Sequence, residues 1–239
     1  MAAVRTEILY EDEHIIVAAK PSGLATQSGK VGQPDMVSEL KKHLASQTPG
    51  KPPYLGVVHR LDQPVEGLLV FAKDNKTAAA LTKQLSVGSL HKTYYAVLCG
   101  QPEKKEDCLV DYLIKTQDNA AKVVEKFHSD AKKAVLRYQV LQTIDMPCAL
   151  ALAEIHIETG RFHQIRVQMS HAGYPLLGDV KYGTEETKTI GRSLSISAVG
   201  LCACSLEFTH PVSQERMHFE VKPSGKAFSF FSYDKAVHR

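Results

Sequence analysis

The chain has 239 residues, of which 44% are hydrophobic and 23% charged, and its formal net charge is +3. This composition is typical of a folded globular protein and argues against a disordered or fibrous chain. The charge alone is too small to indicate nucleic-acid binding. The five cysteines contain no C-x-x-C pair, which argues against a zinc ribbon or a disulfide framework and favours a reducing, cytoplasmic setting.

The first fifty residues alternate short apolar segments with turns. Residues 8–10 and 15–19 are apolar and flank an acidic turn, which predicts an antiparallel hairpin. The Lys-Pro-Ser-Gly-Leu sequence at 20–24 then ends the strand, because proline fixes one dihedral angle and glycine permits a reversal. Residues 26–53 are polar and rich in Gly and Pro, but three apolar side chains at helical spacing behind Asp35 predict one short helix there.

Arg60 and Asp62 lie between two short apolar runs. Residues 55–58 and 68–72 are rich in Val and Leu and are separated by turn residues, so they predict two buried strands joined by a loop that carries the charged side chains. Two interpretations stay open at this point. The Arg and Asp pair with each other as a structural clamp, or Asp62 lies in a cleft as a nucleophile or base.

A helix, a strand and a hairpin are predicted next. Residues 74–85 are rich in Ala and Leu, which favours a helix. Residues 91–98 have the aromatic and β-branched content of a strand. Because side chains alternate along a strand, Tyr94 and Tyr95 must face opposite sides, and only one of them can belong to the core. Residues 101–131 mix lysines with acids, so we expect a solvated surface hairpin.

Two further strands are predicted at 135–144 and 149–157, around a turn at 145–147. In the second strand small and branched side chains alternate on one face, which predicts a sheet packed on one side. After a loop that contains Tyr182, the chain is expected to form a last long strand at 201–209.

Residues 162–172 form the second informative stretch. Apolar side chains recur at helical spacing and predict a helix, with Thr159 or Gly160 as its N-cap. Two arginines and a histidine then lie beside unpaired backbone N–H groups, which is an anion-binding arrangement, and a solvated basic face is the alternative. His163 and His171 are eight residues apart, too far to hold one metal ion.

Seven short segments, in the right order, resemble the RluA family of RNA pseudouridine synthases. The similarity is centred on H-R-L-D at 59–62, followed by G-L-L-V-F-A-K at 67–73. Several motifs in order are more specific than any one of them, and together they cover about residues 8–223. The other segments are K-P-S-G-L at 20–24, K-T-Y-Y-A at 92–96, T-G-R-F-H-Q-I-R at 159–166, G-D-x-x-Y-G at 178–183 and H-P at 210–211.

The resemblance implies a fold, a reaction and a set of catalytic residues. The implied fold is α+β, with a mixed, mostly antiparallel central sheet, flanking helices and a central RNA-binding cleft. Asp62 is implied as the catalytic nucleophile, which attacks the target uridine at the ribose or on the ring so that the base detaches, turns and rejoins through C5. Arg166 is implied to pair with Asp62 and keep it ionised. Tyr94 is implied to stack on the base and to help remove the C5 proton, and a core aromatic on a strand is the alternative for this residue.

The resemblance also implies residues that hold RNA. A stacked uridine cannot reach a carboxylate in a cleft, so the base must leave the stack, and the strand around it must be held. Arg60 and Arg161 become candidates for phosphate contacts, and His163 belongs to the same RNA-binding set. Lys20 and Lys73 are further candidates, with ordinary solvent exposure as the alternative for each lysine.

We expect residues 1–239 to form a single pseudouridine synthase domain without a separate N-terminal RNA-binding domain. The expected partner is rRNA or tRNA, and we expect a monomer that uses no cofactor, no metal and no membrane. Val65-Glu66 replaces the Thr-Ser pair of many family members, and Gln168 and Cys202 occupy positions where the family often has His. Local specificity is therefore expected to differ.

Two other functions are alternatives to this one. A non-catalytic RNA-binding module or RNA folding assistant would keep the cleft and lose the chemistry, but intact Asp62, Tyr94 and Arg166 argue against it. A hydrolase that uses Asp62 to activate water would need a second carboxylate or a metal cluster at suitable spacing, and the sequence has neither.

Overall fold

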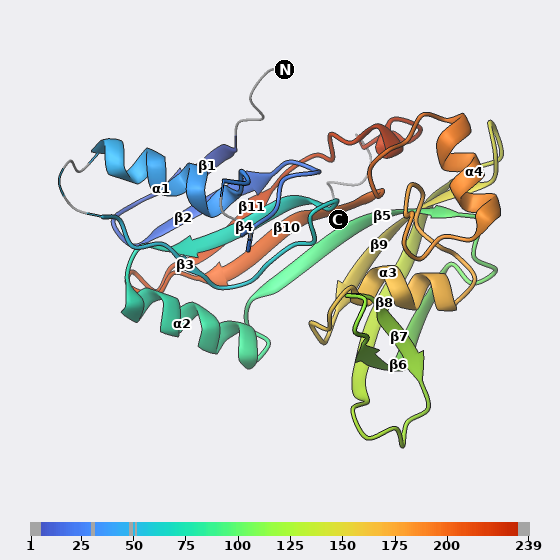
Figure 1. Cartoon of the computed structure of the whole chain (residues 1–239), viewed down its shortest axis with the longest axis horizontal. Helices are drawn as coiled ribbons and strands as arrows, with labels where there is room; N and C mark the ends of the chain where they lie inside the picture. The colour runs from blue at the N-terminus through green and yellow to red at the C-terminus, as the bar shows by residue number, and fades with distance from the viewer. Residues whose placement is uncertain (1–5, 30–31, 48–49, 51, 234–239) are drawn as a thin grey trace. The chain divides into compact units, whose positions relative to one another are not determined.

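The computed structural model describes residues 6–29, 32–47, 50 and 52–233 (Figure 1). The chain forms two compact units. Unit 1 comprises residues 1–92 and 203–221, and unit 2 comprises residues 93–202 and 222–239. The fold is α+β with a mixed, mostly antiparallel sheet, as the sequence predicted, and the described part contains four α-helices.

Unit 1 is a small sheet covered by helices. Its strand order is β1-β2-β4-β10, with β3 paired to β4 and β11 paired to β10. Every residue of β2 except one and every residue of β4 is buried, so both strands lie in the core. Gly67 in β4 has φ +121°, and a Cβ there would overlap the backbone of Ala203, so only glycine allows this close approach. The elements are β1 Glu7–Glu11, β2 Ile15–Lys20, α1 Met36–Gln47, β3 Gly56–Val57, β4 Glu66–Ala72, α2 Asn75–Ser86 and β11 Arg216–Glu220.

Unit 2 is built on a larger antiparallel sheet, in the order β5-β9-β8-β6-β7. Helix α3 lies across one face of this sheet (Figure 1). There Val167 packs on Leu113, Ala121 and Ala134. Strands β5 and β10 each begin in one unit and continue in the other. The elements are β5 His91–Cys99, β6 Glu106–Lys115, β7 Ala121–Val124, β8 Lys132–Ile144, β9 Leu150–Ile157, α3 Gln164–His171, α4 Glu185–Ser193 and the 3-10 turn Lys226–Phe228. Strand β10, Leu201–Thr209, has its first two residues in this unit and the rest in unit 1.

Most predicted elements are confirmed. The first hairpin, the helices at α1 and α2 and the strands at β5 and β10 lie where the sequence placed them. Asp35 caps α1 by accepting a hydrogen bond from Ser38 N at 2.7 Å, and Asp74 caps α2 through Thr77 N at 2.8 Å. The predicted surface hairpin is β6 and β7, which pair antiparallel. All five cysteines are free thiols.

Two predictions need correction, and one helix was missed. Helix α3 begins at Gln164 rather than 162, and its N-cap is His163. His163 has a left-handed φ of 54°, so the right-handed helix cannot extend toward the N-terminus through it. Strand β9 was expected to be packed on one side, but its first four residues are all buried, so both faces are covered. Helix α4 was not predicted at all. No helix in the described ranges is long and apolar enough to cross a membrane.

Candidate active site

Asp62 lies half-buried in the loop between β3 and β4 of unit 1. The loop is closed by Val65 N, which donates to the Asp62 carbonyl at 3.0 Å. Thr26 holds the residue before Asp62 from both sides, because its hydroxyl donates to Leu61 O at 3.0 Å and accepts from Leu61 N at 3.2 Å. Ser22 donates to Pro64 O at 2.7 Å on the far side of the loop. The loop therefore has its shape set by the segment that follows β2.

Lys20 is the centre of this arrangement. Its side chain is 1% exposed, and its Nζ donates to Pro21 O at 3.0 Å, to Leu24 O at 2.6 Å and to Gln63 O at 2.9 Å. Burial lowers the pKa of Lys20 to about 8, although the negative charges of Asp62 and Glu66 act in the opposite direction. An ammonium group has three donors, and all three are used inside the protein. The expectation of solvent exposure is wrong, and Lys20 is not available to an RNA phosphate in this structure.

The ammonium group of Lys73 is also bound by other groups of the protein. Its Nζ lies 3.0 Å from Glu11 Oε1 and donates to the Asp12 carbonyl at 2.6 Å, so it links the end of β4 to the turn between β1 and β2. Ordinary solvent exposure does not describe this residue either. Arg60 is different: its side chain is exposed at the rim of a hollow of about 290 Å³ that is lined also by Gln27, Val57, Val58 and His59.

His59 is buried beside that hollow. Its Nε2 accepts a hydrogen bond from Val70 N at 3.4 Å, which ties the loop to β4. Burial holds the pKa of His59 well below its usual range, and the nearby charge of Lys92 acts in the same direction. The imidazole is therefore neutral, and its bond to Val70 N supports the loop structurally.

Tyr94 lies on β5 within unit 2, opposite Ile155 of β9. It is 5% exposed, whereas its neighbour Tyr95 is only half-buried. The expectation that one of the two tyrosines belongs to the core is confirmed, and it is Tyr94 that does so. Tyr94 and Arg166 belong to unit 2, and Asp62 belongs to unit 1.

Arg166 is held by a carboxylate of its own unit. Its Nε donates to Asp179 Oδ2 at 2.7 Å and its Nη2 to Asp179 Oδ1 at 2.8 Å, and the two side chains are 5% and 0% exposed. Asp179 Oδ1 also accepts from Lys181 N at 2.9 Å and from Tyr182 N at 3.1 Å. Such a two-point pair fixes the plane of the guanidinium as well as its position. It uses two of the five N–H donors of the arginine.

Tyr182 joins Arg166 to the β6–β7 hairpin. The centre of its ring is 5.1 Å from Arg166 Cζ, in cation–π range. Its hydroxyl accepts from Ala121 N at 2.7 Å and shares a 2.7 Å hydrogen bond with His163 Nδ1. Sequence analysis gave no role to Asp179 or Tyr182. The signal that could have found them was the G-D-x-x-Y-G segment, which places both residues in one tight turn.

The predicted RNA-binding residues around the start of α3 form a second cluster. His163 stacks on Phe162 at 3.7 Å between ring centroids, and Lys115 Nζ lies 4.8 Å from the centre of the same Phe162 ring. Arg161 is exposed and its Nε donates to Lys133 O at 2.9 Å. Because α3 starts at Gln164, the predicted anion site at its first turn loses Arg161 and His163, which precede the helix.

Gln164 shapes this turn and was missed in the sequence. Its Oε1 accepts from Thr159 Oγ1 at 2.8 Å and from Arg161 N at 2.9 Å, and its Nε2 donates to Val135 O at 3.0 Å. The buried amide of Gln164 thus makes the hydrogen bonds at the turn before α3, the role that the sequence assigned to an N-cap at Thr159 or Gly160. Gln168, one turn later, donates to Asp111 Oδ2 at 2.9 Å and fastens α3 to β6.

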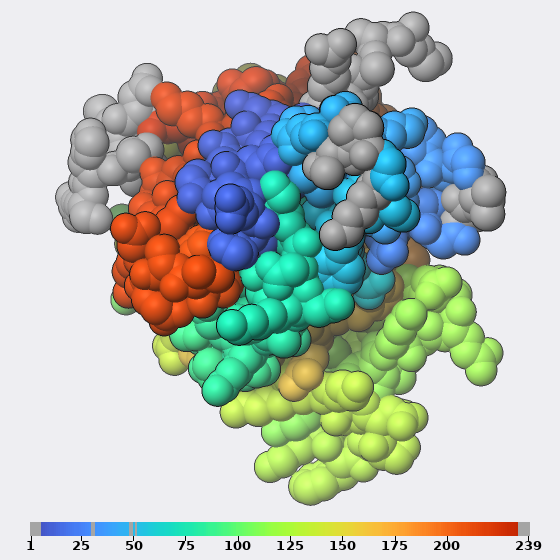
Figure 2. Space-filling view, turned by 90° about the vertical axis from the view of Figure 1, so that its left-hand side faces the viewer, coloured from blue at the N-terminus to red at the C-terminus, as the bar shows by residue number. Residues whose placement is uncertain are grey.

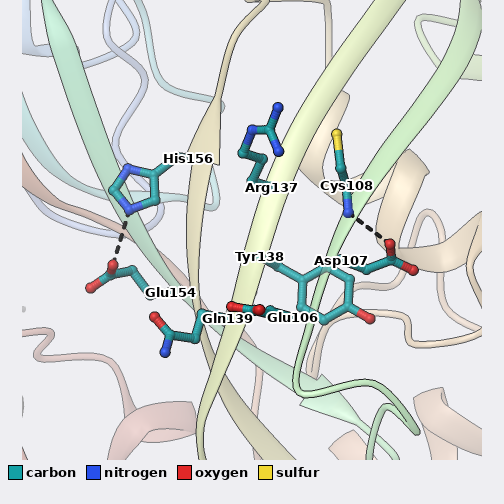
Figure 3. Close-up of a pocket in the computed structure, with 8 residues that line it drawn as sticks. All are labelled: Glu106, Asp107, Cys108, Arg137, Tyr138, Gln139, Glu154 and His156. Atoms are coloured by element: carbon teal, nitrogen blue, oxygen red, sulfur yellow. Dashed lines mark hydrogen bonds and ion pairs between the residues drawn. The ribbon is translucent and has the colours of Figure 1, made fainter.

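A separate hollow of about 430 Å³ lies on β6, β8 and β9 of unit 2 (Figure 3). Some of its charged groups are paired: His156 Nε2 is 2.9 Å from Glu154 Oε1, which raises the pKa of His156, and Arg137 Nε is 2.9 Å from Glu158 Oε1. None of the predicted site residues lines it. Among the residues that the structure describes, no group of three His, Cys, Asp or Glu side chains could hold a metal ion.

Known proteins show what this chain is similar to. The sequence pattern of the RNA pseudouridylate synthase family matches residues 14–171. Ribosomal large subunit pseudouridine synthase D of Zymomonas mobilis is 33% identical over 226 residues, which is 90% of this chain and 68% of that protein. The tRNA pseudouridine synthase C of Vibrio parahaemolyticus is 28% identical over 91% of this chain and 90% of its own length.

A solved structure from the relatives of this chain has a similar fold. Human RNA Pseudouridylate Synthase Domain Containing 4 superimposes with a TM-score of 0.72 at 25% identity, over 91% of this chain and 89% of that one. Among the curated relatives, the matched part ranges from 58% to 90% of the relative's own length. The family pattern covers more than half of the chain, and the fold is shared. The chain therefore belongs to the RluA family of RNA pseudouridylate synthases.

Proposed function

We propose that the chain isomerises specific uridines of rRNA or tRNA to pseudouridine, with Asp62 as the nucleophile. The reaction class follows from the family, and the two RNA classes follow from the names of the relatives, which act on the large ribosomal subunit or on tRNA. The observation that carries the assignment to Asp62 is its loop, which is tied at Leu61, Gln63 and Pro64 and still leaves the carboxylate half-buried rather than enclosed. A nucleophile held in place before the substrate arrives reduces the entropy cost of attack.

The chemistry needs three events at one uridine. Asp62 attacks the ribose or the ring and forms a covalent bond to it, and the bond between N1 and the ribose breaks. The base then turns, C5 bonds to the ribose, and the bond to Asp62 breaks. The proton on C5 leaves and N1 takes up a proton, so that the atoms balance. The product is an isomer of the substrate, so no oxidant or second substrate is required. Tyr94 stacks on the detached base and replaces the stacking that the RNA has lost.

Arg166 is proposed as the partner that keeps Asp62 ionised. The Asp179 bridge supports this role, because it fixes the plane of the guanidinium. Arg166 thereby carries a defined orientation within its own unit. The meeting of Asp62, Tyr94 and Arg166 in one central cleft remains a prediction.

RNA binding is proposed to rest on Arg60 and Arg161, whose side chains are both exposed. His163 is retained as a contact in the same segment, next to Arg161. Lys20 and Lys73 are not retained, because their Nζ groups bind carbonyl or carboxylate oxygens of unit 1. We further propose that the protein acts as a monomer in the cytoplasm, within a single synthase domain.

The test is to map pseudouridine across total RNA from cells with and without this protein. The proposal predicts one or a few sites in rRNA or tRNA that disappear without it and return when the purified protein is added to that RNA. Mass measurement of the whole RNA would not suffice, because substrate and product have equal mass. If no site depends on the protein while it still binds RNA, the non-catalytic RNA-binding module becomes the better description.

A further inference from the structure

The loop between β7 and β8, residues 125–131, presents one aromatic ring to solvent. Phe127 is 91% exposed. In Figure 1 this loop lies at the lower end of unit 2, and in Figure 2 the same yellow-green segment lies at the surface. Among the described residues no other large apolar side chain is as exposed as Phe127. Phenylalanine gains more from burial than most residues do, so this ring has a large apolar area left to bury against a partner.

The loop holds the ring outward by its own hydrogen bonds. His128 N donates to Glu125 O at 3.1 Å, and Ala131 N donates to His128 O at 3.0 Å. Asp130 N lies 3.3 Å from His128 Nδ1. Two successive turns therefore shape the loop, and Phe127 lies in the first of them. The side chain is displayed by an ordered turn, and little ordering is needed when a partner binds.

Phe162 gives a useful contrast in the same unit. Its ring is in contact with His163 at 3.7 Å between centroids and with Lys115 Nζ at 4.8 Å from its centre. Phe127 makes no ring–ring contact with any described residue, and the nearest described cation, Lys126 Nζ, is 5.8 Å from its centre. A planar ligand could thus stack on Phe127 without displacing a protein side chain.

The loop is surrounded by cations. Lys122, Lys126, Lys132 and Lys133 are all exposed, and no ion pair is described for any of them. Against these four positive charges the segment 122–133 has two acids, Glu125 and Asp130. The basic end of the loop also adjoins a proposed RNA contact, since Arg161 Nε donates to the carbonyl of Lys133 at 2.9 Å.

We propose that Phe127 stacks on an unpaired base of the substrate RNA, away from the target uridine, while the neighbouring lysines bind its phosphates. This inference rests on the proposed function, because it takes RNA as the substrate. One exposed ring between cations matches a single strand, in which each base has a flat face and each linkage a negative charge. Removal of one such stack lowers affinity by about 5- to 100-fold. The contact favours RNAs that have an unpaired nucleotide besides the target uridine.

The chain contains no tryptophan, which makes a direct test possible. Phe127→Trp places a single fluorophore in the loop, and a base stacked on its indole quenches the emission. Val212→Trp is the matched control, because Val212 is 54% exposed in a turn of unit 1. Each variant is titrated with total RNA from cells lacking the protein and with a short oligoadenylate, and binding is followed independently by the anisotropy of labelled RNA. We expect strong quenching at position 127 and little at 212.

Kinetics on the mapped RNA complete the test. Phe127→Ala and Phe127→Leu should raise KM about 5- to 100-fold with kcat nearly unchanged, and Phe127→Tyr should behave like the wild type, because a flat ring and not apolar character is required. If anisotropy shows that RNA is bound to Phe127→Trp but the emission of this variant is not quenched, the inference is overturned, even when the wild type is fully active. Emission that responds only to anionic lipid vesicles would overturn it in favour of a membrane surface. A wild type without activity would refute the proposed function while the quenching result still stands on its own.

Discussion

Arg166 and Asp179 form a buried two-point salt bridge, with Nε 2.7 Å from Oδ2 and Nη2 2.8 Å from Oδ1. The sequence motifs pointed to Arg166 alone, and the structure adds the carboxylate that orients it. If Arg166 serves Asp62 in catalysis, Asp179 acts one step removed, as a positioning residue.

Asp179→Asn should lower kcat much more than it changes KM, because the arginine loses its fixed plane while RNA contacts elsewhere are kept. The amide retains one acceptor for Arg166 but not the charge, so stability should fall by up to about 3 to 5 kcal/mol, the cost of breaking a buried pair. Steady-state kinetics and urea unfolding of the same preparation measure both effects. A folded variant with wild-type kcat would show that Asp179 has no part in the reaction.

Tyr182→Phe tests the link between Arg166 and the β6–β7 hairpin. The substitution keeps the ring over the guanidinium but removes the acceptor of Ala121 N–H and the partner of His163. An N–H left without a partner should cost about 1 to 3 kcal/mol, measured by urea unfolding. Tyr112→Phe is the control, since no hydrogen bond is described for the Tyr112 hydroxyl, and it should change stability by less than about 0.5 kcal/mol. Equal effects of the two changes would contradict the assigned role.

Lys20 should give the stability of unit 1 a distinct pH dependence. Its pKa is lowered from 10.5 to about 8 in the folded chain, so between these values the unfolded chain binds more protons and stability rises with pH. The charged form therefore costs up to about 3 kcal/mol below pH 8, and this cost disappears as the pH approaches 10.5. Lys20→Met lacks the titrating group. The difference in unfolding free energy between wild type and variant should grow in favour of the wild type from pH 8 to 10, and a constant difference would contradict the burial of the charge.

RNA affinity should depend steeply on salt, because phosphate contacts release bound counterions. Arg161→Gln should weaken binding to all RNAs and reduce the slope of log K against log salt by about 1, the value for one lost phosphate contact. Arg192→Gln is the comparison, since Arg192 is an exposed arginine on α4 of the same unit. If both variants keep the wild-type slope, Arg161 does not contact a phosphate.

Particular residues show where prediction from the sequence succeeds and where it ends. Runs of apolar residues, the cap Asp35 and the Ala- and Leu-rich stretch at 74–85 located most strands and two helices, because these signals are local. Helix α4 was missed because Gly191 is its only buried residue, so it has no apolar stripe to detect. The start of α3 was misplaced because the side chain of Gln164 holds the turn before it through contacts with β8, 29 residues away.

The candidate site was also only partly predictable from the sequence. Family motifs supplied Asp62, Tyr94 and Arg166 as candidates, but not the groups that hold them. The burial of Lys20 depends on carbonyls from two segments, one of which is 43 residues away in the sequence. The pairing of Asp179 with Arg166 depends on how the G-D-x-x-Y-G turn folds back on α3. Contacts of this kind arise from tertiary structure, and no local pattern encodes them.

The central claim is that Asp62 is the nucleophile, and Asp62→Asn tests it most directly. The change keeps the shape of the side chain and removes its negative charge, and phosphate contacts should survive because other residues make them. RNA carrying tritium at C5 of uridine releases tritium to water at each turnover, since the new bond to the ribose displaces the hydrogen at C5. The account predicts wild-type release at the mapped site and essentially none from a folded variant that still binds RNA. Release by the folded variant at the wild-type rate would contradict the account and leave Asp62 as a structural clamp of its loop.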